Sequence, residues 1–169
     1  MVLLYKGRKR PFRKKYFAIL EKFLNFASAN KHLIIMKYFT FFEFEYSDKA
    51  VQNKVKNYPT VEYEENIRAL VENLLDPIRE RYGKPIVIGS GFRNATVNSL
   101  VGGVSNSQHM TGCAADLQVG SKEENKKLFE MIKEMGGFDQ LINEHDFSWV
   151  HVSYNPKGNQ RGQVLNISK

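Results

Sequence analysis

Two histidines and one aspartate in this chain have the chemistry and the local setting of metal ligands. His109 precedes Asp116 by seven residues, and His151 lies in the apolar run Trp149–Ser153. Alternate residues of a strand face opposite sides, so Asp116 and His151 would each lie on the polar face of an otherwise apolar strand. Two such strands side by side would bring both side chains to one ion. Two imidazoles and a carboxylate, with a fourth position open, are the ligand set of a catalytic zinc ion.

Spacing alone leaves an ordinary interpretation open for each of these residues. A single histidine is usually exposed or satisfied within a core, and a single aspartate is usually solvated or caps a helix. Cys113 lies between His109 and Asp116 and could bind metal as a thiolate, but we interpret it as a small buried residue. Because it is the only cysteine, an internal disulfide is excluded.

The elements that must position these residues include one long helix. Apolar residues recur at intervals of three and four over residues 63–82, which predicts an amphipathic helix. Pro77 should kink or divide it, and Gly83 should end it. Ser121 begins a second helix with a capping box, and residues 94–101 form a brief third one.

Five short apolar runs are predicted to be strands. They are residues 85–89, 114–119, 139–143, 149–153 and 163–167, the last at a sheet edge. The aromatic segment 38–48 is either a further strand or an arm whose rings pack on the core. Helices and strands alternate without a regular βαβ rhythm, so the predicted fold class is α+β.

The positive charge is confined to the start of the chain. The net charge is +7, yet residues 1–35 hold nine Lys or Arg against one Glu, which leaves 16 basic and 17 acidic residues in 36–169. We therefore predict a basic extension over 1–35 and one domain over 36–169. The extension could contact an anionic surface, pack loosely, or precede a translation start at Met36; the domain itself is not expected to bind nucleic acid.

Export by the basic extension is not expected. Glu21 and Lys22 interrupt the apolar stretch that a signal peptide needs, and no run of the chain is long and apolar enough to span a membrane. These features do not predict where the protein is located.

The candidate ligands lie in motifs that resemble the M15 peptidase family. These enzymes are zinc D-alanyl-D-alanine carboxypeptidases and related cell-wall endopeptidases, including phage endolysins. The resemblance rests on Ser90-Gly91-Phe92-Arg93, Val101-Gly102-Gly103, the pattern SxHxxGxAxD (Ser107, His109, Gly112, Ala114, Asp116), and Trp149-Val150-His151-Val152-Ser153-Tyr154. It covers about residues 36–165.

The resemblance implies a fold, a cofactor and an activity. The fold would have a central antiparallel sheet flanked by helices, the D-Ala-D-Ala-peptidase/hedgehog-like arrangement. His109, Asp116 and His151 would bind Zn²⁺, and metal-activated water would hydrolyse peptide bonds in peptidoglycan stem peptides. A monomer that stays in the cytoplasm until release is compatible with the family.

The general base departs from the family pattern. Many relatives place a carboxylate three residues before the last histidine, where this chain has Ser148. Glu144 is the favoured substitute, Asp146 the second, and His145 the third. The departure also leaves open a catalytically silent relative that keeps zinc and binds cell-wall peptide.

Two further residues are predicted to bind substrate. Arg93 follows a strand on a Ser-Gly turn, from which a guanidinium can clamp a terminal carboxylate with two hydrogen bonds. The resemblance implies the same role, which suits a substrate that ends in D-Ala; the alternative is an arginine paired to a surface acid. Ser107 either hydrogen-bonds substrate near the metal or shapes its loop.

Overall fold

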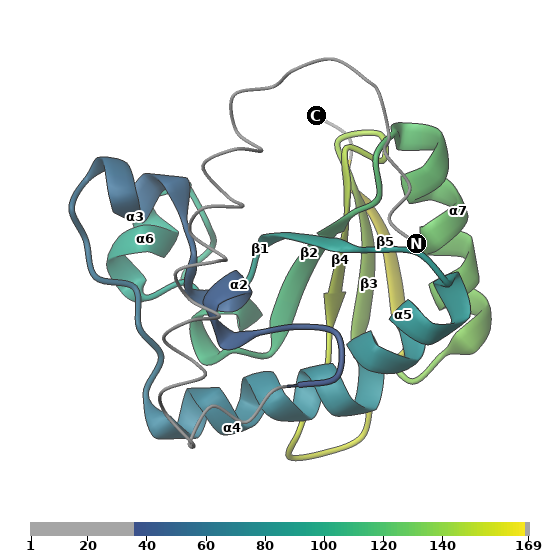
Figure 1. Cartoon of the computed structure of the whole chain (residues 1–169), viewed down its shortest axis with the longest axis horizontal. Coiled ribbons are helices and arrows are strands. Elements are labelled where there is room, and N and C mark those ends of the chain that lie inside the picture. Colours follow the sequence, from purple (N-terminus) through teal and green to yellow (C-terminus); the bar gives the residue numbers. More distant parts are fainter. Residues whose placement is uncertain (1–35, 168–169) are drawn as a thin grey trace, which may run out of the picture. The chain divides into compact units, whose positions relative to one another are not determined.

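The computed structural model describes residues 36–167, so the basic extension predicted over 1–35 lies outside the described residues. The described residues form one five-stranded sheet with helices around it (Figure 1). The predicted α+β class is therefore confirmed, whereas the domain boundary after residue 35 stays a prediction.

The sheet is antiparallel except at one edge. Its strands are β1 (Val87–Ser90), β2 (Ala114–Gln118), β3 (Gln140–Glu144), β4 (Trp149–Ser153) and β5 (Gln163–Ile167), in the order β1-β2-β4-β3-β5. The antiparallel arrangement holds for β1, β2, β4 and β3, but β5 pairs parallel to β3. The connection 154–162 passes the start of β3, where Gln163 N donates to Asp139 O, so β5 runs beside β3 in the same direction.

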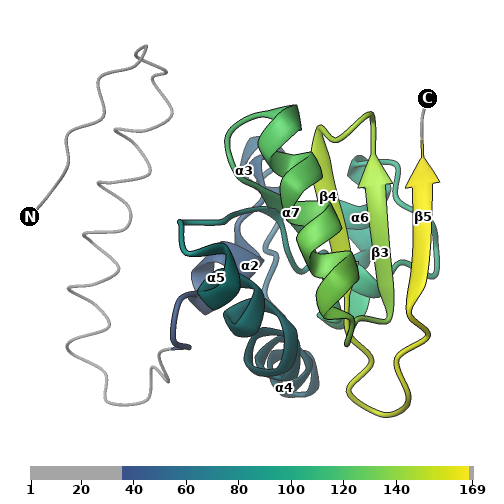
Figure 2. The ribbon, with the colours of Figure 1, turned by 90° about the vertical axis from the view of Figure 1, so that its right-hand side faces the viewer.

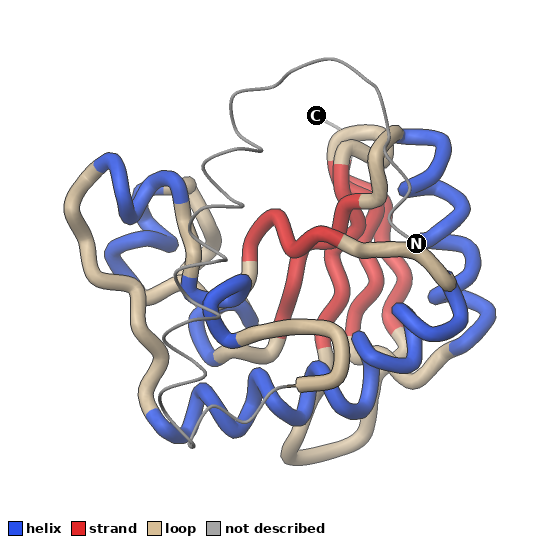
Figure 3. Tube along the Cα trace, viewed as in Figure 1, coloured by secondary structure: helices blue, strands red, loops and turns tan. Residues whose placement is uncertain are grey.

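Helices occupy the remaining regular segments (Figure 3). They are α2 (Phe41–Glu45), α3 (Asp48–Gln52), α4 (Val61–Leu70), the π-helical η1 (Val71–Leu75), α5 (Asp76–Tyr82), α6 (Ala95–Leu100), the 3₁₀-helical η2 (Gln108–Thr111) and α7 (Lys122–Met135).

The long helix is divided just before its proline. Pro77 lies in the first turn of α5, and the wider π turn of η1 comes immediately before it. A proline has no N–H to donate to the preceding turn, which explains why the regular α-helical pattern changes at this point. Gly83 ends α5 in the left-handed conformation with φ of +73°, as predicted.

The aromatic segment near residue 40 is a short helix, so the strand interpretation was wrong. Thr40 and Glu43 form a capping box, in which the Glu43 carboxylate accepts a hydrogen bond from Thr40 N at 2.8 Å. Phe39 and Phe44 are buried in the core. The packing role predicted for these rings is therefore confirmed.

One face of the sheet carries the core. Five fully buried side chains cover it, and they share one cluster with buried residues of α4, η1, α5 and α7. Figure 2 shows α4, α5 and α7 gathered on the same side. The five are Ala115, Leu117, Leu141, Val150 and Val152. Because side chains alternate along a strand, Asp116 and His151 must face the opposite side.

Candidate active site

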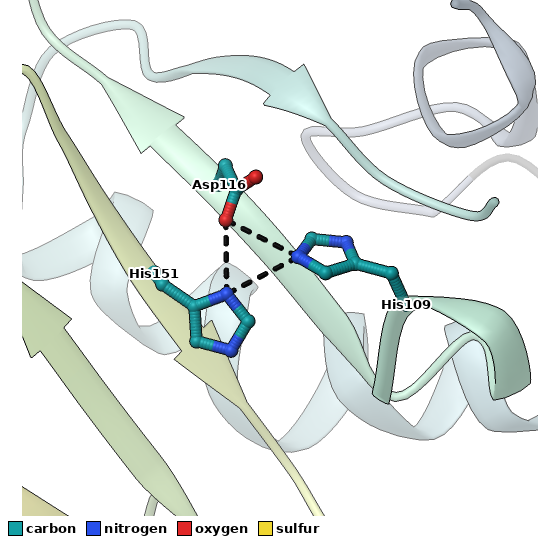
Figure 4. Close-up of side chains that lie close together, drawn as sticks. All are labelled: His109, Asp116 and His151. Atoms are coloured by element: carbon teal, nitrogen blue, oxygen red, sulfur yellow. Dashed lines mark hydrogen bonds and ion pairs between the residues drawn. The ribbon is translucent and has the colours of Figure 1, made fainter. Parts of the chain in front are cut away.

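The structure brings the three predicted ligands together. Asp116 on β2 and His151 on β4 are directly paired across the antiparallel ladder, and His109 reaches them from η2. Asp116 Oδ1 lies 2.9 Å from His151 Nδ1 and 3.2 Å from His109 Nε2, and the two histidine nitrogens are 3.1 Å apart (Figure 4). Three potential donor atoms therefore face one point.

The backbone around Gly91 fixes which nitrogen His109 presents. His109 Nδ1 is 2.7 Å from the carbonyl oxygen of Gly91, so this nitrogen carries the proton and donates it. The other nitrogen, Nε2, is left with a lone pair toward Asp116 and His151. Gly91 has to be glycine, because a Cβ there would lie 2.5 Å from Cα of Phe44.

Gly112 positions the same histidine from the other side. It ends η2 with φ of +72°, and a Cβ on it would lie 2.6 Å from the carbonyl oxygen of Tyr63. A side chain at this position would be strained and would also push η2 away from α4. The glycine of the SxHxxGxAxD pattern thus has a direct structural reason.

The protonation states suit a cation. His109 is almost fully buried, and burial lowers its pKa, which favours the neutral imidazole. Burial alone would raise the pKa of Asp116, but its interactions with His109, and then with His151, outweigh the effect of burial and hold this pKa well below its usual range. An ionised carboxylate beside a neutral imidazole is the state in which both bind metal.

The spacing of the donors fits a zinc ion. Zinc–ligand bonds of about 2.0–2.2 Å in a tetrahedron separate neighbouring ligand atoms by about 3.3 Å. The three observed separations of 2.9–3.2 Å are only slightly shorter. An ion would therefore replace the three mutual contacts with little movement of the side chains. The Cys113 thiol is not among these donors, in agreement with the packing role predicted for it.

His109, Asp116 and His151, which we call the triad, line a cleft of about 740 Å³. Besides the three predicted ligands, its lining includes Arg93, Ser107, Glu144, Trp149, Gln140 and Arg161. The cleft gives water and a peptide access to the donor atoms, and it brings both predicted substrate-binding residues to the same place.

Arg93 is held beside the triad by its backbone. Its N–H donates to His109 O at 3.1 Å, and the buried Asn57 bonds the residues on either side, Phe92 O and Asn94 N, at 2.9 Å each. The Arg93 guanidinium lies 3.8 Å from Asp116 Oδ2, and its Nε is buried without a partner among residues 36–167. This arginine is not paired to a surface acid.

Glu144 is the carboxylate that the fold turns toward the triad. It ends β3 opposite Trp149 and lines the cleft. Burial raises its pKa, as does the negative charge of Asp116, while His151, His145 and Trp149 lower it. A half-buried carboxylate with a raised pKa has the properties of a general base.

Asp146 and Ser148 are turned elsewhere. The Asp146 side chain is 81% exposed, pairs with Lys122 at 3.1 Å and does not line the cleft. Ser148 Oγ donates to His145 O at 2.7 Å inside the hairpin turn. The geometry therefore supports Glu144 and gives no support to Asp146. His145 does line the cleft, with its ring 4.8 Å from that of Trp149.

A polar cluster at the start of β3 was missed by sequence reasoning. The buried Asp139 accepts hydrogen bonds from Arg161 Nε at 2.9 Å, Arg161 Nη2 at 2.5 Å and Gln108 Nε2 at 2.9 Å. Arg161 holds the pKa of Asp139 down at about 2. The three residues are far apart in the sequence and share no local pattern, so only the position of Gln108 beside His109 could have suggested it.

A buried asparagine that was also missed supports the hairpin after Glu144. Asn125 on α7 donates to Phe147 O at 2.9 Å and Ser148 O at 3.1 Å, and accepts from Val119 N at 2.8 Å. Three successive hairpin residues, His145, Asp146 and Phe147, have φ between 48° and 56°, which non-glycine residues adopt only when held. Asn125 is one of the groups that hold them.

Comparison with known proteins agrees with this geometry. A His-Asp-His cluster that lines a cleft has the donor set of a catalytic zinc site. Residues 37–153, more than half of the chain, match the family described as Peptidase M15, so the chain belongs to that family. Family membership and the ligand set together identify Zn²⁺ as the cofactor.

One curated relative matches a shorter segment. The zinc D-Ala-D-Ala carboxypeptidase of Streptomyces albus G is 55% identical over 49 residues, which make up 28% of this chain and 19% of that protein. The matched segment is thus less than a fifth of the length of the relative.

Proposed function

We propose that this chain is a zinc peptidase that removes the terminal D-alanine from peptidoglycan stem peptides. The observation that carries the proposal is the gathering of His109, Asp116 and His151 in one cleft with Glu144 and Arg93. Family membership and the name of the curated relative support this substrate class.

The three proposed ligands share one task, which is to hold the ion. His109 Nε2, His151 Nδ1 and Asp116 Oδ1 would hold the ion. When bound, zinc supplies Lewis-acid polarisation of the scissile carbonyl and activation of the hydrolytic water. Gly91 O accepts a hydrogen bond from the proton on His109 Nδ1 and so keeps His109 in the tautomer whose Nε2 can bind the ion.

Glu144 would move the proton. Its carboxylate accepts a proton from the attacking water and passes it to the leaving amine nitrogen, which balances the hydrolysis. Its raised pKa makes the protonated form easier to reach midway through this sequence. Arg93 would bind the terminal carboxylate of the substrate through its guanidinium, whose Nε has no partner among the described residues.

Mass spectrometry of a defined stem pentapeptide and of peptidoglycan digests tests the proposal, with and without a metal chelator. The expected result is loss of one D-alanine from the pentapeptide, abolished by chelator and restored by Zn²⁺. Cleavage only in cross-linked material would replace the carboxypeptidase with an endopeptidase. If neither substrate gives a product while zinc is bound, the chain would instead be a catalytically silent protein that binds cell-wall peptide.

In the described part of the chain no helix has the length and apolar character needed to cross a membrane. The monomeric state and the contact of the basic extension with anionic surfaces stay predictions.

A further inference from the structure

Arg161 is an arginine of the cleft whose charge the proposed reaction does not use. It follows β4 in the connection to β5, and its side chain is 55% exposed. It lines the same cleft as the triad although it touches none of the three ligands. An arginine in this setting either supports the fold or meets the substrate.

Its guanidinium is fixed in place before any substrate arrives. Asp139 accepts from Nε at 2.9 Å and from Nη2 at 2.5 Å, and its Oδ1 also accepts from Arg161 N at 3.2 Å. Asp139 is itself held by Gln108, the neighbour of His109. Because the Arg161 side chain is already ordered, binding a substrate group would cost little further conformational entropy, and this favours binding.

The guanidinium still has donors to offer. An arginine carries five N–H groups, and two of them bind Asp139. The others, both on Nη1 and one on Nη2, have no hydrogen-bond partner within residues 36–167. A planar fork of such donors matches a carboxylate.

The position of Arg161 determines how far from the scissile bond a substrate carboxylate bound to its guanidinium would lie. Asp139 N donates to Ser153 O at 2.8 Å, and Ser153 is two residues along β4 from His151. Two residues of strand span about 7 Å. An extended peptide rises by about 3.3–3.6 Å per residue, so the group would belong to the second residue from the cleaved bond.

We propose that Arg161 is a second substrate anchor, which binds a side-chain carboxylate about two residues from the scissile bond. In a stem pentapeptide cleaved before its last D-alanine, this residue is the third, the diamino acid. The substrate class is then a stem peptide whose diamino acid carries a free carboxylate, as in meso-diaminopimelate. This inference rests on the proposed function.

Two stem pentapeptides test it, one with meso-diaminopimelate at position three and one with the ε-carboxamide of the same residue. For the zinc-loaded full chain we expect kcat/KM to be about tenfold or more higher with the free carboxylate, since a hydrogen bond to a charged group is lost in the amide. In R161Q the two substrates should react equally, mainly because KM rises for the acid. K157Q should keep the preference, because Lys157 pairs with Glu62 outside the cleft.

The outcomes separate the two proposals. Equal rates in the unmodified protein, or an equal loss for both substrates in R161Q, would overturn the anchor and leave a structural role through Asp139. Cleavage of neither substrate would overturn the proposed function itself. Zinc content and melting temperature are measured for each variant, and R161M replaces R161Q if the latter does not fold.

Discussion

The two faces of the central sheet are built from opposite chemistry: one is a fully buried apolar core, and the other carries the polar residues that line the cleft. On β2, Leu117 is fully buried against the helices, while its neighbour Asp116 turns to the other side, where His109 is 1% exposed. Burying a leucine stabilises the fold by about 1.5–3 kcal/mol. Burying a carboxylate and two imidazoles costs free energy unless they satisfy one another or bind a cation. The polar face is therefore explained by function and the apolar face by stability.

This difference predicts that substitutions on the two faces will have different consequences. Changes at His109, Asp116 or His151 on the polar face should remove metal and activity while the fold remains. Changes on the apolar face should reduce stability while each folded molecule still binds zinc.

The largest effect is expected for Asp116→Ala. It removes the carboxylate that both histidines contact, so we expect the zinc to be lost and kcat/KM to fall by roughly 10³-fold or more, since Lewis-acid catalysis is worth several kcal/mol. Metal analysis after dialysis and hydrolysis of the stem pentapeptide measure both. An alanine variant that keeps one equivalent of zinc would remove Asp116 from the ligand set.

Leu117→Ala, one residue along the same strand, should have the opposite profile. We expect the free energy of unfolding to fall by about 3 kcal/mol, because a large buried side chain leaves a cavity in the core. Chemical denaturation measures this, and zinc per folded molecule should not change. Val87→Ala, at a strand position that is 53% exposed, is the control and should cost less than about 1 kcal/mol. Equal losses in both variants would contradict a core confined to one face.

A smaller effect is expected for Glu45, a carboxylate that, unlike Asp116, has no histidine partner within residues 36–167. Burial, and then the nearby charge of Glu64, raises the pKa of Glu45 to about 7. The folded state thus holds this proton more tightly than the unfolded state does, and stability is lost as pH rises from about 4.5 through 7. Glu45→Gln should raise the stability by about 1 kcal/mol at pH 8 and leave it unchanged at pH 4.

Thermal melting at the two pH values checks this prediction. Glu72→Gln, on the exposed side of the long helix, is the control. A variant that melts at the same temperature as the unmodified protein at pH 8 would show that Glu45 is better solvated than its position indicates.

Much of the metal site could be predicted from the sequence because strand alternation is a local rule. Asp116 and His151 each stand between apolar neighbours, so their common face followed from the pattern, and the ladder places them opposite each other. His109 was a candidate from its position seven residues before Asp116, and the family motif supported it. The strand boundaries also agree with the observed ones to within about two residues, and β5 coincides with its prediction.

The rest depends on contacts between distant residues. Asp139 and Arg161 are brought together only because β5 pairs parallel to β3, and that pairing has no signal in either strand alone. The helix at 41–45 was interpreted as a possible strand because aromatic residues favour strands, whereas the capping box of Thr40 and Glu43 begins a helix here. The hairpin after Glu144 also depends on a distant residue, because its conformation is held by Asn125 on a separate helix.

The most direct test of the account is the activity and zinc content of Glu144→Gln, measured beside Asp146→Asn. The account predicts that Glu144→Gln keeps one zinc and loses about 10²–10⁴-fold in kcat, because the amide cannot accept the proton of water. Asp146→Asn should retain both, since that side chain is exposed and pairs with Lys122. Normal turnover in Glu144→Gln, or loss of turnover with zinc retained in Asp146→Asn, would contradict the assignment of Glu144 as the base.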